Sequence, residues 1–197
     1  MLTRALLTFL LLVTAAAAQE APPPVPFHMP TPEGWRTETI PFPLGFAPEL
    51  AFEGLEELRF APGMFTANSE DFWTYAFVWW IAEPDPLAPA DLAADLETYF
   101  AGLIQAVGES RELKVDDVLH EVTLTSAPDG DLDMVGTAHT FDPFVTAAPV
   151  RLNVRVKQFA CPDAERRVVW FELSPQPFDH AVWGVLGDMR QAFRCAK

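Results

Sequence analysis

Residues 72–81, with the sequence FWTYAFVWWI, are the most apolar stretch of the chain after its first 18 residues. In a β-strand, alternate side chains lie on opposite faces of the sheet. One face of this stretch would carry Trp73, Tyr75, Phe77, Trp79 and Ile81, and the other would carry Thr74, Ala76, Val78 and Trp80. Because both faces are mainly apolar, the stretch predicts a central strand that is covered on both sides.

Two helices are predicted, and the longer one follows this strand over residues 88–107. Its apolar side chains recur at helical spacing, at Leu92, Leu96, Phe100, Leu103 and Val107. Pro89 suits a first helical turn, and Gly108 suits the position just past a helix end. The second helix is predicted over residues 179–194.

Five further strands are predicted from alternation and turn signals, over residues 55–60, 118–126, 132–141, 150–158 and 168–173. Pro128-Asp129-Gly130 predicts a hairpin turn. The order of strands, helix, strands and helix indicates a single α+β domain over residues 35–197. We expect an antiparallel sheet with two main helices packed on one face.

The N-terminus has the features of a secretory signal peptide over residues 1–18. Arg4 precedes the apolar run ALLTFLLLV, and Ala16-Ala17-Ala18 provide a small-residue cleavage site. The apolar run is shorter than the about 20 residues that a membrane-spanning helix needs. We therefore expect a periplasmic or secreted protein without a stable membrane anchor, in which residues 19–34 form a Pro-rich, extended or disordered lead-in.

The chain has two cysteines, Cys161 and Cys195. Cysteines of exported proteins tend to pair, because the compartments they enter are oxidising. The sequence contains no C-x-x-C motif. We therefore predict a structural disulfide between Cys161 and Cys195, which would fix the last helix to the strand region before it.

The charge is strongly acidic, with 13 Lys and Arg against 28 Asp and Glu and a formal net charge of −15. Phosphate contacts dominate nucleic-acid binding, so this charge argues against nucleic acid and anionic membrane surfaces as partners. Motifs such as H-E-x-x-H, G-x-S-x-G and the glycine-rich phosphate loops do not occur in the sequence. The sequence therefore predicts neither a cofactor nor a metal.

His120 and His139 are the best candidates for an acid–base or metal site. They are equally distant from the predicted hairpin turn and would face each other across two strands, with Glu121 and Asp142 as acidic neighbours. Two imidazoles do not make a closed metal site, and ordinary surface or half-buried histidines are the alternative. An exported enzyme, such as a hydrolase using this pair, is the second functional hypothesis.

Three charged residues lie in the strand predicted over residues 55–60. Glu56 and Glu57 are adjacent and would point to opposite faces, so they would not act as a carboxylate pair. Glu57 and Arg59 would share a face, where we expect an ion pair.

Residues 56–65 read EELRFAPGMF and are followed by the pattern Trp73-x-Tyr75-x-Phe77-x-Trp79-Trp80. This combination resembles a family of uncharacterised exported bacterial proteins that share an R-F-A-P-G-M-F segment ahead of an aromatic strand. The resemblance implies an exported bacterial protein and carries no activity with it.

The leading functional hypothesis is noncatalytic binding of a protein partner or an apolar small molecule. The aromatic stretch offers more ring surface than one small core needs, which makes Trp73, Trp79 and Trp80 the candidate ligand-binding residues. The alternative is that these rings are core. Exposure of Trp79 or Trp80 on the surface or in a cavity would favour binding.

Overall fold

The computed structural model describes residues 25–128 and 130–196. The predicted signal peptide, residues 19–24 of the predicted lead-in and Asp129 of the predicted turn lie outside the described residues. The main strands are β2 (Arg36–Pro41), β3 (Gly54–Phe60), β4 (Tyr75–Ile81), β5 (Glu121–Ser126), β6 (Met134–Asp142), β7 (Ala148–Cys161) and β8 (Arg166–Ser174). The helices are α1 (Pro89–Ser110), α2 (Val182–Ala192) and the short 3₁₀ turn η1 (Pro162–Ala164).

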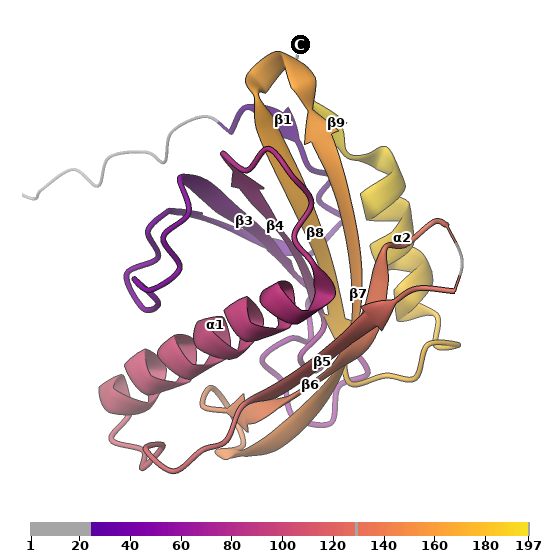
Figure 1. The fold of residues 1–197 in the computed structure, drawn as a ribbon. Helices are drawn as coiled ribbons and strands as arrows, with labels where there is room; N and C mark the ends of the chain where they lie inside the picture. The colour runs from indigo at the N-terminus through magenta and orange to yellow at the C-terminus, as the bar shows by residue number, and fades with distance from the viewer. Residues whose placement is uncertain (1–24, 129, 197) are drawn as a thin grey trace, which may run out of the picture.

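These seven strands form one antiparallel sheet in the order β2-β3-β4-β8-β7-β6-β5 (Figure 1). The prediction of a single α+β domain with an antiparallel sheet and two helices is confirmed. Within the described residues, no helix is long and apolar enough to cross a membrane.

The aromatic strand β4 lies inside the sheet, between β3 and β8, and both of its faces are covered. Tyr75, Phe77, Trp79 and Ile81 belong to one hydrophobic cluster, and Ala76, Val78 and Trp80 belong to the other. The strand begins at Tyr75 rather than at residue 72, because the chain turns at Trp73, whose φ is +50°. The Trp73 amide donates to the carbonyl of Met64 at 3.1 Å.

The two helices cover opposite faces of the sheet, so the prediction that both pack on one face is wrong (Figure 1). α1 contributes Leu92, Leu96, Phe100 and Ile104 to the first cluster, and α2 contributes Val182, Trp183, Leu186 and Met189 to the second. The reason lies in β4 and β8, which alternate apolar residues on both faces. A central strand of this kind needs a separate apolar layer on each side.

The last residues before the C-terminus are tied to the segment that precedes β2. Strand β1 (Phe27–His28) pairs with β9 (Arg194–Cys195), and Phe27 and Met29 are buried in the α2-side cluster. These residues of the predicted extended or disordered lead-in are therefore extended and ordered, because their apolar side chains complete that cluster. His28 between them is exposed.

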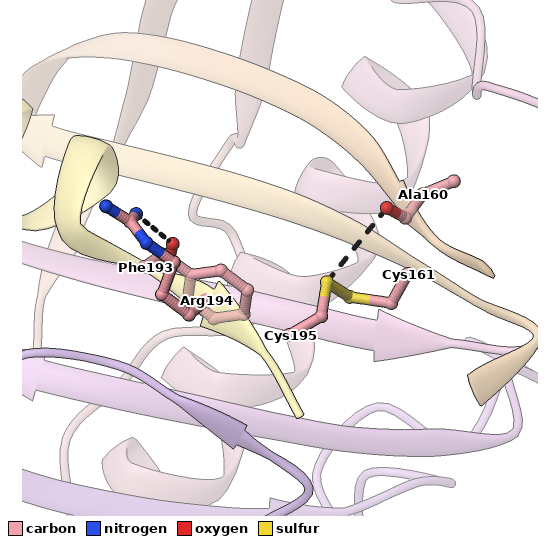
Figure 2. The surroundings of a disulfide bond; sticks show 5 residues. All are labelled: Ala160, Cys161, Phe193, Arg194 and Cys195. Atoms are coloured by element: carbon pink, nitrogen blue, oxygen red, sulfur yellow. Dashed lines mark hydrogen bonds between the residues drawn. A yellow bond between two sulfur atoms is a disulfide. The ribbon is translucent and has the colours of Figure 1, made fainter. Parts of the chain in front are cut away.

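The predicted disulfide between Cys161 and Cys195 is present, and their Cα atoms lie 5.7 Å apart (Figure 2). It joins the end of β7 to β9, directly after α2. The bond therefore fixes the C-terminal helix to the sheet, as expected.

Candidate functional site

A pocket of about 250 Å³ opens on the α1 side of the sheet, near its β2 edge. Side chains from β2, β3, β4, α1 and three connecting segments form its walls. They are Glu38, Ile40, Phe46, Leu58, Phe60, Met64, Phe65, Trp73, Tyr75, Tyr99, Leu103, Val107 and Phe144. The lining is apolar and largely aromatic, which is typical of small-molecule sites.

Strand alternation and helical periodicity explain the lining. Leu58 and Phe60 are two residues apart on β3 and so face α1, while Tyr99, Leu103 and Val107 recur every four residues along α1. The segment between β3 and β4 closes one end, where the rings of Phe65 and Phe144 meet edge to face at 5.2 Å.

Glu56 is a fully buried carboxyl group on the same face of β3. Its Oε1 accepts a hydrogen bond from Trp79 Nε1 at 3.3 Å, and its Oε2 has no partner of standard geometry. Burial raises the pKa of Glu56 to about 8, against the lowering effect of the hydrogen bonds from Trp79 and Tyr99. Glu56 is therefore mainly protonated near neutral pH and can donate a hydrogen bond.

Two tyrosines share the electrostatic environment of Glu56. Burial raises the pKa of both Tyr75 and Tyr99, and the charge of Glu56 raises both further. The hydroxyl of Tyr75 is buried without a hydrogen-bond partner, although its ring lines the pocket. Tyr75 thus lines the pocket with its ring while its hydroxyl is buried and unpaired, and Glu56 is not part of the lining.

The pocket lining carries one charged side chain, the exposed Glu38. Its neighbour on the same face of β2 is Arg36, whose guanidinium carbon lies 4.5 Å from the centre of the Phe65 ring. The lining itself contains no Lys or Arg. Nothing in these walls complements an anionic ligand inside the pocket.

The three tryptophans proposed as ligand-binding residues occupy different places. Trp73 is buried and lines the pocket. Trp79 is buried, does not line the pocket, and donates a hydrogen bond to Glu56 through Nε1. Trp80 points to the opposite face, where Arg166 lies 5.0 Å from its ring centre. Of the three, only Trp73 stands where a ligand in this pocket would touch it.

The two predicted histidines do not face each other. The register of β5 and β6 pairs His139 with Glu121, one residue away from the predicted pairing. A shift of one residue moves a side chain to the other face of the sheet. His120 accordingly bonds Thr140 through Nδ1 at 2.9 Å, on the α1 side, while His139 is exposed on the opposite side.

Asp142, predicted as an acidic neighbour of the histidine pair, forms its hydrogen bonds with the turn that follows β6 instead. Its carboxylate accepts hydrogen bonds from the backbone amides of Phe144, Val145 and Thr146 and from the Thr146 hydroxyl. Burial raises the pKa of Asp142, but these hydrogen bonds outweigh it and the pKa is lowered overall. The side chain therefore shapes the turn that positions Phe144 in the pocket wall.

Within residues 25–128 and 130–196, no group of three His, Cys, Asp or Glu side chains could hold a metal ion. The predicted ion pair between Glu57 and Arg59 is present and buried, on the side of β3 that faces away from the pocket. Comparison of the chain with protein-family models, with curated proteins and with solved structures finds no match in any of the three.

Tyr75 and Tyr99 of the pocket lining, and the buried Glu56, were not among the predicted site residues. One signal was present in the sequence, since Glu56 has the same strand parity as Leu58 and Phe60 and so had to face an apolar layer. Whether that layer was closed or left a cavity depends on the approach of α1 and of the segment between β3 and β4. Strand alternation contains no information on that approach.

Proposed function

We propose that this is an exported, noncatalytic binding protein whose pocket between α1 and strands β2, β3 and β4 takes an apolar small molecule. The pocket carries the proposal, because aromatic and aliphatic side chains surround a space of about 250 Å³ with few polar groups beside it. Trp73 supplies part of this wall, whereas Trp79 and Trp80, whose exposure the sequence hypothesis asked for, are not part of it.

Export is supported by two independent features. The chain begins with a pattern typical of secretory signals. The disulfide between Cys161 and Cys195 is consistent with an oxidising compartment outside the cytoplasm. Both support a periplasmic or secreted location.

The resemblance to exported bacterial proteins with an R-F-A-P-G-M-F segment fits the same proposal. Phe60, Met64 and Phe65 of that segment line the pocket. The segment also makes the turn after β3, in which the Met64 amide donates to the Ala61 carbonyl at 3.0 Å. A family sharing this segment would share a wall of the pocket.

The proposal is tested with the neutral apolar fluorophore N-phenyl-1-naphthylamine. We expect the oxidised mature protein to bind it with enhanced emission. Leu103→Trp, which fills the pocket from α1, should weaken this binding at least tenfold. Ala106→Trp changes an exposed position on the same helix and should bind like the wild type.

Melting curves of both variants establish that they fold. If the wild type does not bind the fluorophore, or if folded Leu103→Trp binds it undiminished, this pocket is not an apolar binding site.

A further inference from the structure

The two edges of the seven-stranded sheet differ in how their backbone groups are satisfied. At one edge α1 lies alongside β5, where the Val122 amide donates to Glu97 Oε1 at 2.9 Å. At the other edge β2 pairs with β3 alone, and its residues Arg36, Thr37 and Glu38 are exposed. An exposed edge strand is a template on which another chain can pair.

Thr37 and Thr39 carry the unused backbone groups of β2. The Phe42 amide donates to the Gly54 carbonyl at 3.0 Å, in continuation of the β2–β3 register. Residues of an antiparallel strand bond alternately to one side and to the other, so the even-numbered residues of β2 bond to β3. The N–H and C=O groups of Thr37 and Thr39 therefore point outward, and no other described segment pairs with them. Pro41, the next outward residue, has no N–H.

Arg36 and Glu38 are complementary charges on one face of this strand. Their neighbours across β3 are the apolar Phe60 and Leu58, and neither charge forms an ion pair with a described residue. The Arg36 guanidinium lies over the ring of Phe65, 4.5 Å from its centre, which holds it on the α1 side of the sheet. Each copy of the edge thus carries one charge of each sign, two residues apart.

We propose that β2 pairs with β2 of a second copy of this chain, antiparallel and centred on Thr37, to form a two-fold symmetric dimer. In this register Arg36 of each copy lies opposite Glu38 of the other, so that two ion pairs form across the contact. Thr37 faces its own counterpart and exchanges two hydrogen bonds with it, and each Thr39 amide donates to the Trp35 carbonyl of the other copy.

The neighbouring register, centred on Glu38, is disfavoured on two grounds. It would place the Glu38 carboxylates of the two copies opposite each other, and like charges directly opposite are destabilising. It would also bring Pro41 into the ladder opposite Trp35, where proline has no N–H to donate. Pairing centred on Thr37 leaves Pro41 outside the contact.

The size and charge of the contact determine how strong the dimer is. Only residues 35–39 of each copy would pair, so the interface is small and the dimer is weak. Each chain has a formal net charge of −15, and two such chains repel each other most at low ionic strength. We therefore expect a dimer that forms with rising concentration at physiological ionic strength. The inference goes beyond the proposed function, because this association needs no ligand.

Sedimentation velocity of the oxidised mature protein tests the proposal, over concentrations from about 5 μM to about 500 μM, where small interfaces dissociate. We expect the average sedimentation coefficient to rise from that of a monomer toward that of a dimer. A monomer at every concentration, or species larger than a dimer, would overturn the proposal.

Charge exchange tests the register. Arg36→Glu and Glu38→Arg each place like charges opposite each other and should weaken self-association by about tenfold or more. The double variant Arg36→Glu/Glu38→Arg restores opposite charges and should associate like the wild type. If the double variant associates no better than the single variants, the two strands do not pair in this register and the proposal is wrong.

Proline at an outward-facing position tests the backbone pairing and leaves the β2–β3 ladder intact. Thr37→Pro removes the amides at the centre of the contact and should abolish the dimer. Ser126→Pro is the matched control, because the Ala127 amide bonds to Asp133 and the Ser126 amide therefore points outward from β5.

Ser126→Pro should associate like the wild type, and melting curves establish that both variants fold. If Ser126→Pro abolishes association and Thr37→Pro does not, the contact lies at the β5 edge and the proposal is wrong. If Thr37→Pro does not fold, the charge-exchange variants still decide between the two outcomes.

Discussion

Each face of the sheet buries a carboxyl group, and the two groups differ in the donors and charges that surround them. On the α2 face, Glu172 is fully buried and accepts hydrogen bonds from Trp170 at 3.2 Å and from Arg190 at 2.8 Å, with Arg155 at 3.9 Å. Burial raises the pKa of Glu172, but the charges of Arg190 and Arg155 oppose the rise. On the α1 face, Glu56 is just as buried, and an indole and a phenol are its donors.

This difference separates a face that is joined to its helix by ion pairs and a disulfide from the face on which we propose that a ligand binds. The α2 face joins its helix to the sheet with ion pairs, the disulfide and the β1–β9 pairing. The α1 face has a cavity. Buried polar atoms without a hydrogen-bond partner occur on both faces, on Glu56 and Tyr75 at the α1 side and on Trp80 and Glu172 at the α2 side.

Removal of the disulfide tests the α2 face most severely. The double variant Cys161→Ala/Cys195→Ala should unfold with a free energy about 4 kcal/mol lower, because the bond restrains the unfolded chain between two residues separated by 34 positions. Urea denaturation measures the loss. Reductant should destabilise the wild type and leave the double variant unchanged, and fluorophore binding at low urea should persist. A loss below about 1 kcal/mol would show that the bond contributes little to this face.

Glu56→Gln tests the α1 face through pH. Glu56 has a folded-state pKa of about 8, above its usual 4.5, so the folded protein holds a proton that the unfolded chain releases as pH rises between these values. The wild type should therefore lose stability relative to Glu56→Gln from pH 5 to pH 8, by an amount on the order of 4 kcal/mol.

Chemical denaturation of both proteins at several pH values measures this difference, and it should level off above pH 8. A constant gap between the two proteins would mean that Glu56 titrates normally and is solvated in the folded state.

The strands and helices follow from local patterns, and so the sequence predicted them well. The disulfide was predicted on other grounds, because the chain has two cysteines and the features of an exported protein. The aromatic alternation of β4, the helical spacing of α1 and the parity of Glu57 and Arg59 are properties of neighbouring residues. The pairing of His120 with His139 was wrong because it assumed a symmetric turn around Asp129-Gly130, whereas the observed register differs by one residue.

The candidate site was harder to predict because it depends on how the helices pack against the sheet, which involves residues far apart in the sequence. Which helix covers which face is decided by the connections after β8, where the chain passes to the side of Trp170 and Val168. The pocket depends on how closely α1 approaches β3. Local patterns identify Glu56 as inward-facing, but they do not show that its Oε2 lacks a partner.

Arg190→Met tests the charge pairing that distinguishes the α2 face. It leaves the buried Glu172 with the Trp170 indole and the more distant Arg155, and loss of the closer charged partner of a buried pair should cost about 3 kcal/mol. The matched control is Arg166→Met, whose partner Glu53 is 81% exposed. It should change stability by less than about 1 kcal/mol. Equal effects in thermal denaturation would show that burial of the partner does not set the strength of these pairs.

One glycine in each helix allows the packing density of the two faces to be compared through the same small substitution. A Cβ atom on Gly102 of α1 would overlap the backbone carbonyl of Phe46, whereas a Cβ atom on Gly184 of α2 would meet no atom within 4 Å. Gly184→Ala should therefore stabilise the protein by about 0.5–1 kcal/mol, because Ala favours the helix and restricts the unfolded chain.

Gly102→Ala makes the same chemical change on α1 and should destabilise the protein by about 1 kcal/mol, since the crowding exceeds the gain in helix propensity. Because Phe46 lines the pocket, this variant should also weaken fluorophore binding, while Gly184→Ala should leave it unchanged. Differential scanning calorimetry and a fluorophore titration measure both effects on the same samples. If Gly102→Ala shifts stability without changing binding, α1 and the Phe46 segment move together and the pocket shape is set by β2 and β3 alone.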